Sequence, residues 1–487
     1  MSSGITEVHT PDWVKHAVFY QIFPDRFAQS DKVEKPHNLQ PWDSLPTVEG
    51  YMGGDLLGVV EHLDHIQDLG ATAIYFTPIF QSAANHRYHT HDYYQVDPLL
   101  GGNAAFQTLL DESHRRGLKV VLDGVFNHAS RGFFQFNDIL EHGPHSPWLD
   151  WFTIEGWPLS PYDGSKPANY LSWVGNRALP KFNTENLQVR EFIMRVAEYW
   201  LRAGIDGWRL DVPFEITTPG FWQEFRQRVK AINPDAYIVG EVWGDSREWL
   251  QGDQFDAVMN YLFAESAIAF AAGPRVRPET VIERSYAPMP PLDGAAYADK
   301  IDWLLALYPW EIQLAQLNLL DSHDTARLIS IAGGDKASVL LATLLMMTYP
   351  GAPSIFYGDE IGLVGDLDPD SRRTMQWDQP EIWDRELLAF HKQVIALRQA
   401  HPALRTGAYH RLYADQDVYA FARTNDAERV FVAVNVAEAP RSVAVPVGDL
   451  LGGEMLEPIF GAGTVMVEAG QVQFALPARS GLVCVCR

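Results

Sequence analysis

The sequence has little cysteine, no long apolar run and no excess of basic charge, and each absence excludes a class of protein. Its two cysteines, Cys484 and Cys486, stand in an apolar stretch where their spacing favours small buried side chains over a disulfide framework or a metal site. The longest apolar run, residues 337–349, is too short to span a bilayer and predicts a buried helix.

The net charge and the first residues of the chain also argue against nucleic-acid binding, membrane binding and secretion. The 62 acidic and 38 basic side chains leave a formal charge of −24, which repels phosphate backbones and anionic lipid. The first residues lack the basic start and apolar core of a signal peptide. We therefore expect a cytoplasmic protein that binds neither nucleic acid nor membranes.

Short apolar runs rich in Val, Ile, Tyr and Phe recur through the first 360 residues and predict strands buried on both faces. They are residues 17–24, 73–80, 119–128, 207–213, 236–243, 255–261, 317–324 and 352–360. Segments with helical periodicity lie between them, for example residues 57–70 and 189–204, and several end in Gly. Eight strands that alternate with helices predict a (β/α)8 barrel. The alternative, a doubly wound open sheet, has no Gly-rich phosphate turn after the first strand to support it.

Two regions break this alternation. Residues 129–178 form a long insertion rich in Pro, Gly and Trp after the third predicted strand. From residue 401 onward the pattern changes to alternating strands separated by turn signals. The predicted fold is therefore α/β: a barrel formed by residues 1–128 and 179–400, an inserted loop region at 129–178, and a C-terminal antiparallel β-sandwich domain at 401–487.

Charged and polar residues follow several of the predicted strands, at the end where the chemistry of such barrels takes place. They are Asp123, Asn127 and His128, then Arg209 and Asp211, then Glu241, and finally Asp321, His323 and Asp324. A structural ion pair or a cap explains any one of them at least as well as catalysis does. Their joint placement at one end of the predicted strands favours an active site.

Three carboxyl groups without a metal-ligand pattern suggest acid–base work on a glycosidic bond. Asp211 suits the nucleophile, because Arg209 two residues earlier favours its ionised form. Glu241, in the more apolar segment "GEVW", suits the general acid, because burial raises the pKa of a carboxyl group.

The ordered motifs "DGVFNH", "GWRLDVPFE", "GEVW" and "LLDSHD" resemble the four short regions typical of the α-amylase family of glycoside hydrolases. "LPKFN" at 179–183 resembles a signature of its neopullulanase and cyclomaltodextrinase subfamily. The resemblance implies that Asp211 is the nucleophile, Glu241 the acid/base and Asp324 the stabiliser of the transition state. It also implies that His128 and His323 bind sugar hydroxyls, that Arg209 positions Asp211 and that Tyr88 stacks on the sugar, with Asp123 and Asn127 in support.

The function implied by this resemblance is retaining hydrolysis of α-1,4-glucosidic bonds in maltooligosaccharides, cyclodextrins, starch fragments or pullulan. A transglycosylase or α-glucosidase of the same family is the nearest alternative, because the same residues form the same covalent intermediate. A non-catalytic member that only binds glycans or a partner is a further alternative, against which the intact carboxyl groups argue. Among the tryptophans of the insertion, we expect one or two of Trp148, Trp151, Trp157 and Trp173 to stack on sugars.

The sequence departs from the subfamily pattern in four places. No long β domain precedes the barrel, so we expect a monomer, or a dimer not formed through such a domain. His89 and Phe214 stand where relatives have Asp and Asn. The loop "RFAQSDKVEKP" keeps only part of the calcium-binding set, and Lys35 stands at a usual Asp. We therefore expect no cofactor and no calcium, and we expect Lys35 to pair with Asp55 or Asp31.

Overall fold

A computed structural model describes residues 8–282, 285–451, 455–468 and 470–486. The first seven residues, on which part of the signal-peptide argument rests, lie outside these ranges. Within them, no helix is long and apolar enough to cross a membrane.

Eight parallel strands form the central sheet, each within one of the eight runs predicted from the sequence. They are β1 (Phe19–Ile22), β2 (Ala73–Phe76), β5 (Lys119–Gly124), β6 (Gly207–Leu210), β7 (Tyr237–Gly240), β8 (Ala257–Val258), β9 (Leu317–Asn318) and β10 (Ala352–Phe356). The strand order is β8-β7-β6-β5-β2-β1-β10-β9, and a parallel bridge between Met259 and Leu317 joins its two ends. The predicted (β/α)8 barrel is confirmed.

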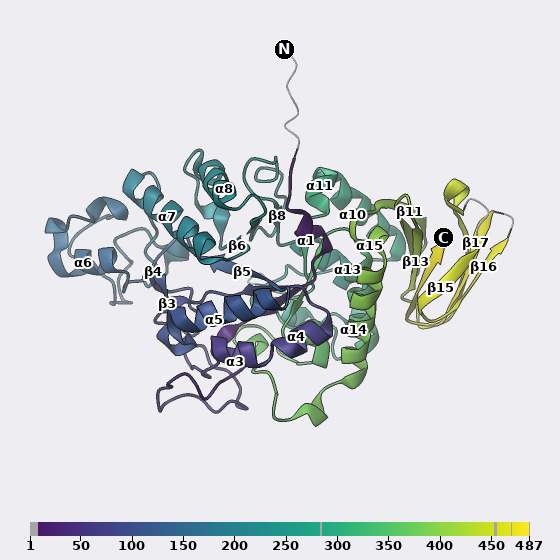
Figure 1. The fold of residues 1–487 in the computed structure, drawn as a ribbon, viewed down its shortest axis with the longest axis horizontal. Coiled ribbons are helices and arrows are strands. Elements are labelled where there is room, and N and C mark those ends of the chain that lie inside the picture. Colours follow the sequence, from purple (N-terminus) through teal and green to yellow (C-terminus); the bar gives the residue numbers. More distant parts are fainter. Residues whose placement is uncertain (1–7, 283–284, 452–454, 469, 487) are drawn as a thin grey trace, which may run out of the picture.

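Helices cover the outside of this sheet (Figure 1). The longer ones are α3 (Leu56–Glu61), α4 (Leu63–Leu69), α5 (Gly102–Arg115), α7 (Leu187–Ala203), α8 (Phe221–Ile232), α9 (Tyr261–Ala271), α10 (Gly294–Leu307), α13 (Lys336–Thr348) and α14 (Arg385–Ala400). Short helices are α1 (Asp12–His16), α2 (Pro24–Phe27), α11 (Trp310–Gln313), α12 (Leu328–Ile331) and α15 (Pro402–Thr406). Helix α13 is the buried helix predicted from the longest apolar run.

The helical pattern at residues 57–70 becomes two helices, not one. Helices α3 and α4 meet at His62, whose backbone angles (φ −113, ψ 12) leave the helical range. Helix α4 then ends at Gly70, and α7 ends at Gly204, both with positive φ, as the sequence predicted for glycine caps.

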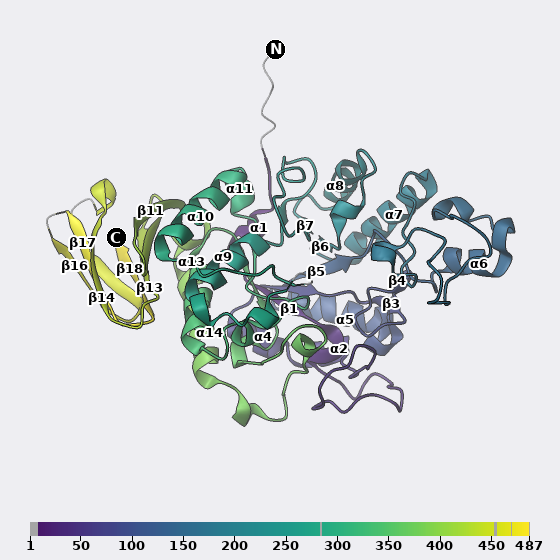
Figure 2. The ribbon, with the colours of Figure 1, turned by 180° about the vertical axis from the view of Figure 1, so that it is seen from behind.

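Two further segments extend the barrel on its carboxyl side. A hairpin of β3 (Phe80–Ser82) and β4 (Thr90–Val96) follows β2, and it was not predicted. The insertion after β5 contains α6 (Phe134–His142) and is tied to the segment before α7 by isolated bridges such as Phe152–Phe182. Figure 1 shows α6 at the end of the molecule opposite to the C-terminal sheets, and Figure 2 shows the same separation from behind.

Two antiparallel sheets form the C-terminal region. One has the order β11-β12-β13-β18-β15 and the other β14-β17-β16. Their strands are β11 (Ala408–Ala414), β12 (Val418–Thr424), β13 (Arg429–Asn435), β14 (Arg441–Pro446), β15 (Leu456–Gly461), β16 (Thr464–Glu468), β17 (Gln471–Leu476) and β18 (Ser480–Cys486). Cys484 and Cys486 lie buried in the apolar cluster of this region, as predicted. The predicted limits of the domains, at residues 128, 178 and 400, stay predictions.

Candidate active site

One cavity of about 510 Å³ opens at the carboxyl ends of the barrel strands. Five of the predicted site residues line it, namely Tyr88, His128, Asp211, Glu241 and Asp324. The other four, Asp123, Asn127, Arg209 and His323, are buried next to these five. The structure therefore brings together all nine residues to which the resemblance assigns a role in the site.

Arg209, on β6, lies between three carboxyl groups. Its Nη1 is 3.0 Å from Asp123 Oδ2 and 3.1 Å from Asp211 Oδ1. Its Nη2 is 3.0 Å from Glu241 Oε2, a contact of charges without hydrogen-bond geometry. The buried Arg209 side chain thus faces three carboxyl groups, from Asp123 on β5, Asp211 after β6 and Glu241 after β7.

Burial raises the pKa of all three carboxyl groups. The pKa of Asp123 rises to about 6 because burial outweighs the Arg209 charge. The pKa of Asp211 lies well above its usual range, first because of burial and then because of the negative charge of Glu241. The pKa of Glu241 is raised mainly by burial. The pair of Asp211 and Glu241 therefore retains a proton at a pH at which an exposed carboxylic acid has lost it.

This result corrects one step of the sequence argument. Burial and the negative charge of Glu241 raise the pKa of Asp211 by more than Arg209, which contacts Asp211 as expected, lowers it. A single guanidinium group does not offset burial together with the repulsion of the neighbouring carboxyl groups. The sequence predicts the contact but not the number of acids that share one cation.

Fixed donors hold the Glu241 carboxyl group. The backbone N–H of Val212 donates to Oε2 over 3.1 Å, and the indole Nε1 of Trp243 donates to Oε1 over 3.1 Å. The Trp243 ring is itself stacked on Tyr261, with ring centroids 3.6 Å apart. The carboxyl group at the end of β7 therefore keeps one orientation.

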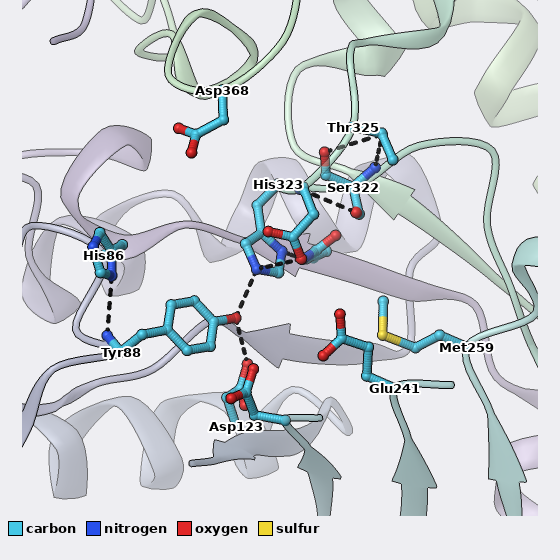
Figure 3. A network of polar contacts seen from close by, with 12 residues as sticks. His86, Tyr88, Asp123, Glu241, Met259, Ser322, His323, Thr325 and Asp368 are labelled. Carbon is cyan, nitrogen blue, oxygen red and sulfur yellow. Dashed lines mark hydrogen bonds and ion pairs between the residues drawn. The ribbon is translucent and has the colours of Figure 1, made fainter. Parts of the chain in front are cut away.

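Tyr88 connects two other predicted residues (Figure 3). Its hydroxyl group donates to Asp123 Oδ2 over 2.9 Å and lies 2.6 Å from His323 Nε2. The rings of Tyr88 and His323 are nearly parallel, with centroids 5.6 Å apart. Tyr88 lines the cavity, and its contacts with Asp123 and His323 fix the position of its hydroxyl group.

Arg372 and Asp368 belong to the site and were not predicted. Arg372 Nη2 is 3.4 Å from Asp324 Oδ1, its Nη1 is 2.9 Å from Asp368 Oδ1, and its Nε donates to the His323 carbonyl oxygen over 2.8 Å. Both residues line the cavity, and Figure 3 shows Asp368 across it from Asp123. The signal was present in "DPDSRR", a stretch that resembles the subfamily, but the loop position gives no periodicity from which to assign a role.

His128 lies on the insertion side of the cavity. Its ring is stacked on Trp173 with centroids 5.4 Å apart, and burial lowers its pKa to about 3. Asn127 Nδ2 is 3.3 Å from His128 Nδ1, which fits a supporting role. Among the four tryptophans considered for stacking, Trp173 lines the cavity, whereas Trp151 is buried against aromatic side chains of the insertion.

The two substituted positions, His89 and Phe214, also line the cavity. Phe214 follows Asp211 in a short 3-10 turn (Pro213–Glu215), and 39% of its surface is exposed. His86, which was not predicted, lies beside His89 with ring centroids 5.1 Å apart. Asp321, another acid at a strand end, instead accepts the N–H of Leu328 and is buried.

The residues at the position where the resemblance implies a calcium site do not fit that ion. Lys35 Nζ lies 2.9 Å from Asp55 Oδ2, as predicted, and Asp55 is fully buried. Asp31 and Glu34 are exposed. An ammonium group against the central carboxylate repels a dication and supplies the positive charge itself.

A parallel eight-stranded barrel that gathers carboxyl groups around a cavity at its carboxyl end defines a class, that of the barrel glycoside hydrolases. Comparisons with known proteins make the class specific. The protein-family model of the alpha amylase catalytic domain matches residues 21–382, and the protein-family model of the alpha-amylase C-terminal domain matches residues 407–484. The chain therefore belongs to the α-amylase family of glycoside hydrolases.

Relatives in this family are similar over most of their length. A cyclomaltodextrinase from a Bacillus species is 46% identical over 87% of this chain and 73% of its own. Neopullulanase 2 from Thermoactinomyces vulgaris is 43% identical over 97% of this chain and 78% of its own. The solved structure of a debranching enzyme from Nostoc punctiforme is 62% identical, covers 98% of this chain and all of its own, and has a TM-score of 0.92.

Proposed function

We propose that this protein hydrolyses α-1,4-glucosidic bonds with retention of configuration, and that its substrates are maltooligosaccharides, cyclodextrins, starch fragments or pullulan. The observation that carries the proposal is the pair of Asp211 and Glu241, two buried carboxyl groups that share one guanidinium group at the cavity floor. The names of the cyclomaltodextrinase and neopullulanase relatives support these substrates.

The pair supplies both groups that retaining hydrolysis needs. Asp211 attacks the anomeric carbon while Glu241 gives its proton to the glycosidic oxygen, so the C–O bond to the leaving sugar breaks as the bond to Asp211 forms. Glu241, now ionised, then takes a proton from water, and the resulting hydroxide displaces Asp211. After the first step Asp211 is a covalent ester and Glu241 is ionised. After the second step Asp211 is again a carboxylate and Glu241 is again protonated.

The remaining residues act on the sugar in the cavity. Asp324, whose side chain is 30% exposed, faces the cavity and stabilises the positive charge of the transition state. Tyr88 offers its ring for stacking, and His128 and His323 bind hydroxyl groups. Arg209 holds the pair from below, with Asp123 and Asn127 in support.

A product screen tests this function. Purified protein is incubated with maltose, maltotriose, cyclodextrins and pullulan, and the products are separated by chromatography. Glucose and maltose from maltotriose, with no longer products, identify a hydrolase, whereas products longer than maltotriose identify a transglycosylase. Release of single glucose units from every chain length identifies an α-glucosidase. No turnover of any of these substrates would leave only a glycan-binding role.

Cleavage of branch points is a second candidate function. The observation that favours it is the 62% identity with the Nostoc punctiforme debranching enzyme, over nearly the whole of both chains. Pullulan separates the two activities, because cleavage at its α-1,6 bonds releases maltotriose and cleavage at its α-1,4 bonds leaves an α-1,6 bond in the product.

A cytoplasmic location and the oligomeric state stay predictions, which cell fractionation and light scattering test.

A further inference from the structure

Gln21, on β1, touches the site from behind. Its side chain is buried, and its amide Nε2 lies 2.8 Å from His323 Nδ1. An amide NH2 group can only donate, so the Nδ1 atom that faces it must accept. A neutral imidazole that accepts at Nδ1 carries its hydrogen on Nε2.

The contact of Nε2 with Asp324 favours the same tautomer, because a carboxylate oxygen can only accept. Nε2 lies 3.1 Å from Asp324 Oδ2 and 2.6 Å from the Tyr88 hydroxyl group. Because the Tyr88 hydrogen is donated to Asp123 Oδ2, the Tyr88 oxygen is free to accept from His323. One direction of donation therefore runs from Gln21 through His323 and Tyr88 to Asp123.

The opposite amide orientation breaks this sequence of donors. If the Gln21 carbonyl oxygen faced Nδ1, that nitrogen would carry the hydrogen and Nε2 would become an acceptor. Nε2 would then face a carboxylate oxygen of Asp324 without a hydrogen between them, 3.1 Å apart. The Tyr88 hydrogen would turn to His323, and Asp123 would keep Tyr75 and Arg209 as donors but lose Tyr88.

We propose that Gln21 is a positioning residue that holds His323 in the tautomer with its hydrogen on Nε2. That hydrogen is directed at the Tyr88 hydroxyl oxygen and at Asp324 Oδ2, so the tautomer positions two side chains that line the cavity. The effect of this positioning on glucan cleavage rests on the proposed function, whereas the tautomer rests on the contacts alone.

His323 has a defined tautomer because it stays neutral. Burial lowers its pKa well below the usual range, and the positive charges of Arg372 and Arg209 lower it further. The groups that face its ring are Gln21, Tyr88, Asp324 and Phe23. A neutral imidazole has one hydrogen, so the partner of Nδ1 decides whether Tyr88 and Asp324 face a donor or an acceptor at Nε2.

Gln21→Glu tests the assignment, because it replaces the donor that faces His323 Nδ1 with an acceptor. The new carboxylate can only accept, so it draws the imidazole hydrogen to Nδ1 and removes it from Nε2. We expect kcat/KM on maltotriose at neutral pH to fall at least about tenfold, the loss that corresponds to one hydrogen bond. The ratio of variant to wild-type activity should rise as the pH falls, because an imidazolium ion carries a hydrogen on both nitrogens.

Two control variants separate positioning from packing. Gln21→Leu removes the partner without reversing it and should lower activity by a factor that does not depend on pH. Gln313→Glu places a carboxylate at another buried glutamine, whose amide donates to the Leu304 carbonyl oxygen, and should lower only the melting temperature. A loss in Gln21→Glu that is constant across pH would overturn the positioning role.

A spectroscopic test needs no activity. Protein labelled with 15N-histidine is measured by long-range 15N–1H correlation, and the His323 signals are identified by their loss in His323→Asn. We expect an unprotonated Nδ1 and a protonated Nε2 in the wild type, and a protonated Nδ1 in Gln21→Glu. A protonated Nδ1 in the wild type overturns the proposal. The expected spectrum from a protein that cleaves no glucan confirms the positioning and rejects the proposed function.

Discussion

Val212 donates its backbone N–H to Glu241 Oε2 over 3.1 Å, so the residue that follows Asp211 anchors the carboxyl group at the end of the next strand. Val212 has a φ of 36, in the left-handed region that β-branched residues rarely adopt. Trp222 Nε1 fixes the same turn by donating to the Pro213 carbonyl oxygen over 3.0 Å. The backbone thus ties the two carboxyl groups together, and their roles can be separated only by substituting one at a time.

Glu241→Gln should lower kcat on maltotriose by about 10²- to 10⁴-fold, the range that a general acid contributes. Its first step should be largely retained on α-maltosyl fluoride, because fluoride leaves without a proton. Asp211→Asn should lose both substrates, because no covalent bond can form. Burst kinetics of fluoride release measure the first step directly.

Glu224→Gln is the matched control for these two variants. It makes the same change from acid to amide on α8, where Glu224 pairs with Arg190 outside the cavity. Its kcat should stay near that of the wild type. Equal losses on maltotriose and on the fluoride in Glu241→Gln would show that Glu241 is not the acid.

Activity should follow a bell-shaped pH profile. In the working state of the pair, Asp211 is ionised and Glu241 is protonated. Activity therefore falls at low pH as Asp211 becomes protonated, and at high pH as Glu241 loses its proton. Because burial raises both pKa values, both limbs should lie above the pH at which exposed carboxyl groups titrate. Measuring kcat/KM from pH 3 to 10 checks this, and a profile that falls off only below pH 4 would contradict it.

The barrel could be predicted from the sequence because its strands are buried on both faces and read as near-continuous apolar runs. Two strands of the C-terminal sheets, β11 and β15, lack this signal. Residues of β11 are mostly half-exposed, and β15 contains Pro458 and a shift of register. Their pairing partners, not their own composition, make them strands.

The placement of the nine predicted residues around one cavity could be predicted from the sequence, but the electrostatics of the site could not. Positions at strand ends identify Asp211 and Glu241, because the fold fixes where those ends meet. The pKa of Asp211 depends on how many acids share Arg209 and how deeply they are buried, which only the packed structure provides. Asp368 and Arg372 come from a loop after β10, where no periodicity restricts position.

The first product should be the α-anomer. We expect a nucleophile and an acid held by one guanidinium group at adjacent strand ends to have carboxyl groups about 5–5.5 Å apart, which is too close for an attacking water molecule between them. Proton NMR within seconds of adding enzyme to maltotriose distinguishes the two anomers before they interconvert. If the β-anomer came first, water would attack directly and Asp211 would be a base.

Acid should destabilise the fold through histidines buried in the neutral form. Burial lowers the pKa of His128 to about 3 and that of His89 to about 4, from an ordinary value of 6.5. Below pH 6.5 the unfolded chain therefore binds protons that the folded chain refuses, so the free energy of unfolding is complete above that pH and falls as the pH drops towards 4. Melting temperatures of His128→Gln and His89→Asn should depend less on pH in this window than that of the wild type. Parallel curves for all three proteins would rule out this origin.

Chelation should leave this protein unchanged, because Lys35 supplies the charge that calcium provides elsewhere. Asp55 accepts the Ser30 backbone N–H over 2.8 Å, the Gly58 N–H over 2.8 Å and the Lys35 ammonium group over 2.9 Å, and it is fully buried. Lys35 Nζ also donates to the Leu99 carbonyl oxygen over 3.0 Å, which fixes the ammonium group on both sides. Activity and melting temperature should therefore not change when EDTA is added.

Lys35→Met tests the same pair from the other side. It leaves a buried carboxylate without its counter-charge and should reduce the free energy of unfolding by about 2 kcal/mol, since the two N–H donors remain. Lys32→Met is the matched control, because Lys32 pairs with Glu61 on the surface, where such a pair contributes little. Urea unfolding measures both changes. A large fall in the wild-type melting temperature with EDTA, reversed by calcium, would instead place an ion at Asp55 and displace Lys35 from it.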